Sequence, residues 1–199
     1  MAEMNVSPEY LGAEFLTFLW HAGESGEELQ VGEHVVRVSV GQHLKLRSMD
    51  GSGSDVVIKG EHAHRAPELF VALWRGAMVV QAKVQLDING TVLSGALKSD
   101  NLTFNGVKLP KVEEQDAGPR VEKGEKPGEN AEIDRQALAD EAAIIDRSAM
   151  LELAQGVVDA WFEQFLKERN SRKHQAWVAA VRKWVAGSIQ GMVDGKLPS

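Results

Sequence analysis

Hydrophobic residues recur at two different spacings along this chain, and each spacing predicts a different element. Large apolar residues three and four positions apart run from Tyr10 to Leu19, after Ser7-Pro8 and before Gly23. A capping serine, a proline at the first helical position and a closing glycine are typical of helix ends. This segment therefore predicts an amphipathic helix.

Alternation of apolar and polar residues follows this helix. Residues 35–40 and 44–47 alternate as two strands joined at Gly41-Gln42, and residues 56–58 predict a short third strand. Helical spacing returns at Pro67–Trp74, which predicts a short helix that crosses the sheet.

The clearest strand covers residues 78–88, where apolar side chains alternate with polar ones. Asn89-Gly90 follows, a dipeptide that favours tight hairpin turns, so Thr91–Lys98 is expected to return antiparallel. Leu102–Phe104 predicts a last short strand or turn. Residues 1–110 thus predict a strand-rich α+β domain with a mainly antiparallel sheet.

Residues 111–130 interrupt this pattern. Between Lys111 and Asp134 there are four basic and eight acidic residues, with glycines and prolines among them and few apolar side chains. Such a segment cannot offset its ordering entropy by packing, so we expect a charged flexible linker.

Helical spacing resumes beyond the linker. One apolar stripe, from Leu138 to Phe165, predicts one long helix or two abutting ones, and a second runs from Trp177 to Met192 after a break at Asn170-Ser171. Residues 131–199 are expected to form a C-terminal helical hairpin, in which two antiparallel helices bury these stripes together.

Composition argues against several classes of protein. The chain of 199 residues has no cysteine, which excludes disulfides and thiolate chemistry and favours the cytoplasm. Its first residues lack the pattern of a signal peptide, and the longest early apolar run, Phe15–Trp20, is far short of the roughly 20 residues that cross a bilayer. We expect a soluble protein with no membrane partner.

Patterns typical of catalysis or cofactor binding are missing. His62 and His64 alternate beside Glu61, but without cysteine and with Arg65 adjacent they favour a solvated loop over a metal site. The linker glycines lack the spacing of a phosphate-binding loop, and Gly51-Ser52-Gly53 favours a turn over a nucleophile elbow. We therefore expect no enzyme activity, no metal and no cofactor.

The formal net charge of −7 argues against a general polyanion-binding surface, so binding of nucleic acid would depend on local clusters. One cluster surrounds the break between the C-terminal helices: Lys167, Arg169, Arg172, Lys173 and His174. A second set can share one sheet face: Arg37, Lys45 and Arg47. A charged helical turn is also ordinary protein surface, and the tryptophans on the apolar stripes are better explained by packing than by base stacking.

Three segments, taken in order, carry a family resemblance. They read EYLGAEFLTFLW at residues 9–20, LTFNGVKLP at residues 102–110 and WFEQFL at residues 161–166. With the strands and the acidic linker between them, they resemble the later portion of the RdgC-type recombination-associated proteins. The resemblance covers most of the chain.

The resemblance implies a cytoplasmic, non-enzymatic α+β protein that binds duplex DNA with little sequence preference and restrains recombinase filaments. Members of the family close into a ring-shaped dimer around DNA. The resemblance starts near the middle of the family's sequence, so we expect the family's N-terminal part to be lacking here and carry over neither ring closure nor the DNA contacts of that part. The DNA-binding residues predicted here rest on local charge alone: Lys167, Arg169, Arg172, Lys173, Arg37, Lys45 and Arg47.

Two hypotheses follow from the sequence. In the first, the protein is a DNA-associated modulator of recombination, with a homodimer partner and a recombinase or other protein as further partners. In the second, it is a protein-interaction module or accessory subunit, such as a phage-encoded one, that binds no nucleic acid. The net charge of −7 suits the second better.

Overall fold

The computed structural model describes residues 7–26, 28–49, 54–108 and 129–195, with the side chains of the longest helix described from Ile144 onward. Its helices are α1 (Pro8–Ser25), the short 3-10 helix η1 (Ala63–Arg65), α2 (Pro67–Trp74), α3 (Glu129–Glu168) and α4 (Arg172–Val193). Its strands are β1 (Glu28–Val31), β2 (His34–Ser48), β3 (Asp55–Lys59), β4 (Ala77–Ile88), β5 (Thr91–Lys98) and β6 (Asn105–Lys108). None of the helices in these ranges is long and apolar enough to cross a membrane. Most of the predicted linker, residues 111–128, lies outside the described residues.

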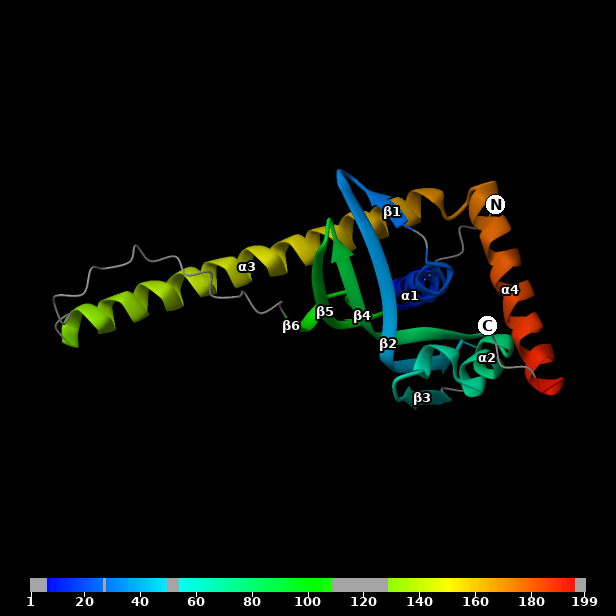
Figure 1. The fold of residues 1–199 in the computed structure, drawn as a ribbon. Helices are drawn as coiled ribbons and strands as arrows, with labels where there is room; N and C mark the ends of the chain where they lie inside the picture. The colour runs from blue at the N-terminus through cyan, green and yellow to red at the C-terminus, as the bar shows by residue number, and fades with distance from the viewer. Residues whose placement is uncertain (1–6, 27, 50–53, 109–128, 196–199) are drawn as a thin grey trace.

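The strands form one antiparallel sheet in the order β1-β2-β4-β5-β6 (Figure 1). One edge of β2 pairs with β4 along most of the length of β2. The other edge of β2 pairs with β1 in its first half and with β3 in its second half. The predicted α+β class, with a mainly antiparallel sheet, an N-terminal helix and a short crossing helix, is confirmed.

The hairpin predicted at Asn89-Gly90 is confirmed. Both residues have positive φ angles, 51° and 90°, as the tight turn requires. The Asp87 carboxylate accepts a hydrogen bond from the Gly90 amide at 2.8 Å, and the Asn89 side chain accepts one from the Val35 amide at 3.0 Å. The turn is therefore tied to the neighbouring strand β2 as well as to its own hairpin.

The prediction of two strands joined at Gly41-Gln42 is wrong, because residues 34–48 form the single strand β2. The backbone passes this point through a bulge, in which Val40 pairs with Val84 and Leu44 pairs with Ala82. From Val40 to Leu44 the chain advances four residues on β2 but only two on β4, so β2 holds two extra residues here. Because side chains alternate between the two faces of a strand, two extra residues leave Val40 and Leu44 both pointing into the core. The hairpin partner of β2 is β1, which the prediction missed.

Helix α1 packs along one face of the sheet, over inward side chains of β2, β4 and β5. Gly12 lies directly against the Ser99 carbonyl group, where a β-carbon would clash, so glycine allows this close approach. The Thr17 hydroxyl donates to the Ala13 carbonyl at 2.8 Å and accepts from the Val79 amide at 3.0 Å. These contacts set the position of α1 on the sheet.

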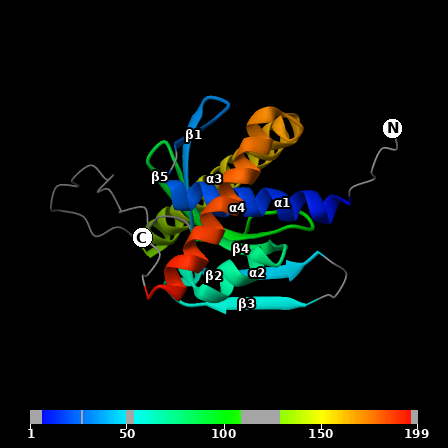
Figure 2. The ribbon, with the colours of Figure 1, turned by 90° about the vertical axis from the view of Figure 1, so that its right-hand side faces the viewer.

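The C-terminal part is a pair of helices, with the predicted break between them confirmed. α3 has 40 residues, and α4 has 22. The second half of α3 packs on α1, where Trp161 and Phe165 lie 6.1 and 5.5 Å from Phe15 between ring centroids. α4 leaves the turn in a different direction and packs on α1 and α2, with Trp184 at 5.1 Å from Trp20 (Figures 1 and 2).

The expectation that the two C-terminal stripes bury each other is wrong. The part of the first stripe from Ala154 to Phe165 and the second stripe instead join one hydrophobic core with α1, α2 and the inner face of the sheet, while Ile145 and Leu151 of the first stripe are exposed. The physical reason is that the aromatic side chains of α1 and α2 present a broad apolar surface that each helix covers separately. The strand-rich and helical parts therefore share one core.

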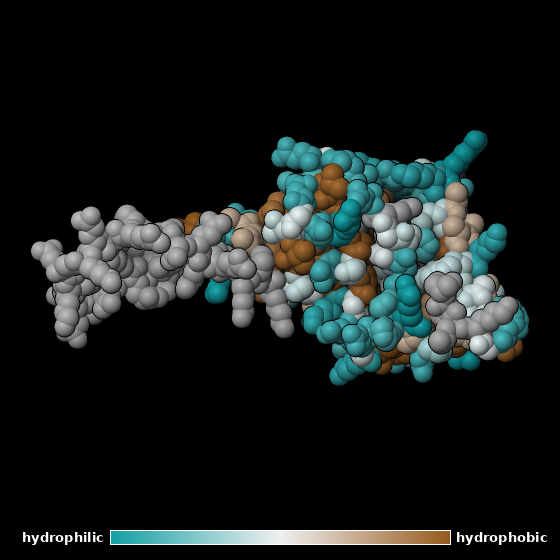
Figure 3. Space-filling model, viewed as in Figure 1, coloured by the Kyte–Doolittle hydropathy of each residue, from teal (hydrophilic) through white to brown (hydrophobic). Residues whose placement is uncertain are grey.

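Helices α1, α2 and α4 lie on the same side of the sheet, in front of it in Figure 2. On the opposite side, outward residues such as Arg37, Ser39 and Lys98 are exposed. We call this opposite surface, made of the outward side chains of β1 to β6, the open sheet face. In Figure 3 hydrophilic side chains cover most of the visible surface of the body, with a hydrophobic patch near the upper ends of β2 and β5.

Candidate nucleic-acid interface

The basic residues predicted at the helical turn are brought together by the fold. Lys167 lies in the last turn of α3, Arg169 follows that helix, and Arg172 begins α4. The Ser171 hydroxyl caps α4 by accepting a hydrogen bond from the His174 amide at 3.1 Å. Three residues separate the end of α3 from the start of α4, so the cations of both helix ends lie close together along the chain.

Arg169 is engaged in a contact of the fold. Its Nε atom lies 2.6 Å from Oε2 of Glu14 on α1, and the two side chains are 24% and 15% exposed. The Nε2 atom of His174 lies 3.2 Å from the other oxygen of Glu14. This cluster fastens the turn to α1, so a phosphate could take the Arg169 guanidinium only by breaking a partly buried ion pair.

The other cations of the turn are exposed. Nζ of Lys173 lies 3.3 Å from Glu168 and Nζ of Lys167 lies 3.8 Å from Glu163, whereas Arg172 has no ion pair with a residue that the structure describes. Exposed pairs of this kind contribute little to stability. Four cations among three carboxylates make the turn a weak positive site.

Arg37, Lys45 and Arg47 lie on one face of β2, as strand alternation predicted, and this is the open sheet face. Each is paired with a carboxylate on a neighbouring strand. Arg37 binds Glu28 on β1, and Lys45 and Arg47 lie 2.6 and 2.9 Å from Asp55 on β3. Arg47 also donates to Glu9 at the start of α1 at 2.6 Å. The hydrogen bonds from Arg47 and Lys45 lower the pKa of Asp55 below its ordinary value.

The pairing of β3, β4 and β5 adds cations to the open sheet face that the sequence analysis missed: Lys59, Lys83 and Lys98. Within the described part of the chain, none of the three forms an ion pair. Among the side chains that the structure describes, the outward charged residues of the strands are six cations (Arg37, Lys45, Arg47, Lys59, Lys83, Lys98) and three carboxylates (Glu28, Asp55, Asp87). Glu9 of α1, which pairs with Arg47, adds a fourth carboxylate at the edge of the face. The face thus has more cations than carboxylates although the formal net charge of the chain is −7. Alternation within one strand does not predict this surplus of cations, because it depends on the register between strands.

A shallow hollow of about 270 Å³ lies on the open sheet face. Its lining comes from four strands and contains polar groups from each of them: His43, Gln81, Lys83, Ser94 and Asn105. Lys83 reaches the Gln42 side chain at 3.4 Å and has no other described polar contact. The hollow can therefore accept an anion at a lysine that has no counter-ion among the described residues.

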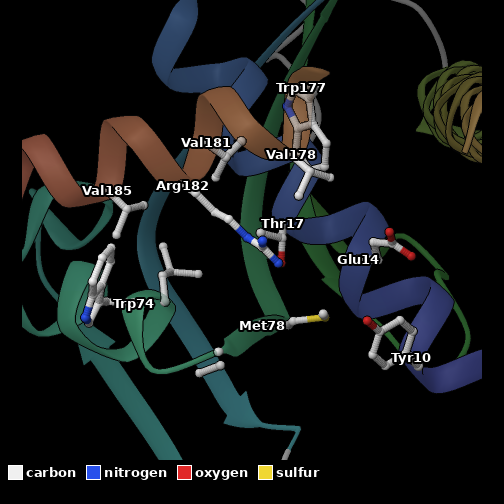
Figure 4. Close-up of a pocket in the computed structure, with 13 residues that line it drawn as sticks. Tyr10, Glu14, Thr17, Trp74, Met78, Trp177, Val178, Val181, Arg182 and Val185 are labelled. Atoms are coloured by element: carbon white, nitrogen blue, oxygen red, sulfur yellow. The ribbon is translucent and has the colours of Figure 1, made fainter. Parts of the chain in front are cut away.

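A larger apolar groove of about 560 Å³ lies between α1, α4 and the segment that joins α2 to β4. In Figure 4, Val181 and Val185 of α4 line it opposite Trp74, and the Arg182 guanidinium points across it toward Thr17. Arg182 has no ion pair with a described residue, and Glu14, which also lines the groove, is paired with Arg169 and His174. The groove thus combines apolar walls with one available cation.

The histidine pair singled out in the sequence has structural contacts. The His64 carbonyl accepts a hydrogen bond from the Trp20 indole at 3.3 Å, and its ring lies 3.9 Å from Glu24. Over the ranges that the structure describes, no group of three or more His, Asp or Glu side chains is placed to hold a metal ion.

The three segments that resemble the RdgC-type family meet in the core. Phe15 of the first contacts Trp161 of the third, and Gln155 on α3 accepts from the Phe104 amide at 2.9 Å and donates to the Leu102 carbonyl at 3.3 Å. The contacts that the structure gives for Phe15, Trp161 and Phe104 are thus packing contacts of the core. A scan against protein-family models and searches of curated proteins and of solved structures found no match. The RdgC-type relationship stays a prediction carried by these segments.

Proposed function

We propose that this protein is a non-enzymatic DNA-binding protein of the cytoplasm that contacts duplex DNA through its open sheet face. The observation that supports the proposal is the surplus of cations on this face, with three lysines that have no carboxylate partner among the described residues. Lysine side chains on a sheet contact phosphates without reading bases. Binding with little sequence preference, which the RdgC resemblance implies, agrees with such contacts.

In this proposal DNA contacts the open sheet face and not the helical turn between α3 and α4. Arg169 is held by Glu14, and the turn lies on the side of the molecule that the helices cover. Arg37, Lys45 and Arg47 remain in the proposed interface. Because their carboxylate partners on the sheet are exposed, these pairs can rearrange toward phosphate at small cost.

The number of unpaired lysines sets the expected salt dependence. If Lys59, Lys83 and Lys98 each neutralise one phosphate, the slope of log K against log salt is about −3. Affinity would then fall roughly 40-fold between about 50 and 200 mM salt. This slope is small beside those of large DNA-binding proteins, so the measurement should begin at low salt.

Two variants with equal loss of charge test the location. Lys59, Lys83 and Lys98 are changed together to Gln in one, and Lys167, Arg172 and Lys173 together to Gln in the other. We expect the sheet variant to lose most of its affinity for a fluorescent duplex and most of its salt slope, and the turn variant to lose little. The reverse result would place DNA at the turn, and no binding by the wild-type protein at low salt would refute the proposed function.

The apolar groove between α1 and α4 favours a second candidate function, a protein-interaction module. A partner segment with a carboxylate beside apolar side chains would match Arg182 and the walls of Val181 and Val185. A protein recovered by pull-down after nuclease treatment, and lost with Val181→Glu, would support this function. Recovery that depends on nucleic acid would contradict it.

A further inference from the structure

We propose that the hollow on the open sheet face is a phosphate-binding site. The inference rests on the DNA-binding function proposed above and gives it one defined anchor, distinct from diffuse attraction by scattered lysines. Its ligand class is a phosphoryl group, either in a nucleic-acid backbone or as free phosphate.

The sheet register forms the two walls of the site. Lys83 on β4 pairs with Ala96 on β5, and Ala96 pairs with Asn105 on β6. Neighbouring strands lie about 4.8 Å apart, so Lys83 and Asn105 flank a gap about 10 Å wide between their α-carbons. Only the methyl group of Ala96 stands between them. The ammonium group on one side and the amide on the other can therefore both reach an anion in the gap.

Neutral donors surround the lysine. Ser94 and Gln81 line the hollow, and neither side chain has a hydrogen bond with a described residue. The Asn105 side-chain amide donates to the Thr103 carbonyl at 2.8 Å, and its second N–H has no acceptor among the described residues. A phosphate offers several acceptor oxygens and would satisfy these donors together with Lys83.

The charges near the hollow also favour an anion. Lys98 pairs across the strands with Gln81 and adds a second cation without a described partner. The carboxylate on the same strand, Asp87, is four residues from Lys83, about 13 Å along β4. Asp55 on β3 is occupied by cations of β2. None of the described residues that line the hollow carries a carboxylate.

Titration with inorganic phosphate tests the site directly. Backbone and side-chain amide resonances of the isotope-labelled full chain are followed by NMR as phosphate is added, with sodium chloride at matched ionic strength as control. We expect shifts confined to residues of the hollow, such as Lys83, Ala96 and Asn105, with phosphate only. Shifts spread evenly over the surface, or equal shifts with chloride, would overturn the proposal.

Two uncharged changes separate a built site from general electrostatics. Ala96→Leu fills the gap and Ser94→Ala removes one donor, while neither alters the charge of the face. We expect Ala96→Leu to abolish the phosphate-induced shifts and to lower duplex affinity at least about fivefold, and Ser94→Ala to lower it up to about fivefold, the factor for one hydrogen bond. Urea midpoints check that both variants remain folded.

The outcomes distinguish this inference from the proposed function. Wild-type affinity for duplex in both folded variants would overturn the phosphate site and leave the DNA-binding function standing. Phosphate binding in the hollow without any duplex binding at low salt would refute the function and support the site for free phosphate. We expect Ala96→Leu to lose the phosphate-induced shifts and to bind duplex more weakly, and Ser94→Ala to show a smaller loss of duplex affinity.

Discussion

Arg169→Ala separates a structural role of the helical turn from a role in DNA binding. The charge pattern of the sequence placed Arg169 among the DNA contacts, whereas its guanidinium donates to Glu14 on α1 at 2.6 Å. We expect the change to destabilise the protein and to leave its affinity for duplex DNA nearly unaltered.

The magnitude follows from the burial of the pair. The two side chains are 24% and 15% exposed, so solvent screens the contact only in part. A hydrogen bond to a charged group contributes about 1.5–3 kcal/mol, and the alanine variant also leaves the Glu14 carboxylate with His174 as its other described partner. We expect a loss of about 2 kcal/mol in the free energy of unfolding. For a chain of this size the melting temperature should fall by roughly 4–8 °C.

Urea unfolding followed by tryptophan fluorescence measures this loss. Arg172→Ala is the matched control, because Arg172 lies three positions away, is exposed and has no ion pair with a described residue. Its free energy of unfolding should change by less than about 0.5 kcal/mol. An unchanged midpoint for Arg169→Ala, together with a large loss of duplex affinity, would refute the reasoning and restore Arg169 as a DNA contact.

Three further predictions concern the fold. Gly12→Ala should cost about 1–3 kcal/mol in urea unfolding, because its β-carbon would clash with the Ser99 carbonyl; an unchanged midpoint would mean that α1 can shift. Phe15→Ala should cost about 3–5 kcal/mol in the same assay, since Phe15 is fully buried among aromatic rings; a cost near that of an exposed residue would contradict this packing. The pKa of Asp55 is held below its ordinary value of 3.8 by Arg47, so its contribution to stability is present above that pH and is lost as the pH falls through the lower folded-state pKa. Asp55→Asn should therefore flatten this part of the curve of urea midpoint against pH, and an identical curve would contradict the pairing.

Elements with a local signal could be predicted from the sequence. Ser7-Pro8 begins α1, Asn89-Gly90 turns the β4–β5 hairpin, and Pro67–Trp74 forms α2, each because a few adjacent residues favour one backbone geometry. The bulge in β2 could not be predicted, since Gly41-Gln42 favours a turn locally. The core keeps the strand continuous by burying Val40 and Leu44 on the same side. Tertiary packing overrides a local preference there.

The candidate site also has a part that the sequence could predict and a part that it could not. Alternation within β2 was enough to place Arg37, Lys45 and Arg47 on one face. It could not bring Lys83 beside them, because the register of β4 against β2 depends on the bulge. Nor could it show that Arg169 is held by Glu14, a residue 155 positions away in the sequence. Charge clusters in a sequence mark cations, but only the fold shows which are neutralised.

Mutations at the helical turn and on the open sheet face should have independent effects on stability and on DNA binding. Arg169 contacts α1 on the helix-covered side, whereas Lys83 points from the opposite face of the sheet, and the two share no described partner. Mutations at distant sites without common partners change free energies independently, within about 0.5 kcal/mol. The double variant Arg169→Ala/Lys83→Gln should therefore unfold at the urea midpoint of Arg169→Ala and bind duplex DNA with the affinity of Lys83→Gln. A further loss of DNA affinity in the double variant, measured where both proteins are fully folded, would contradict this independence and show that the turn supports the open sheet face.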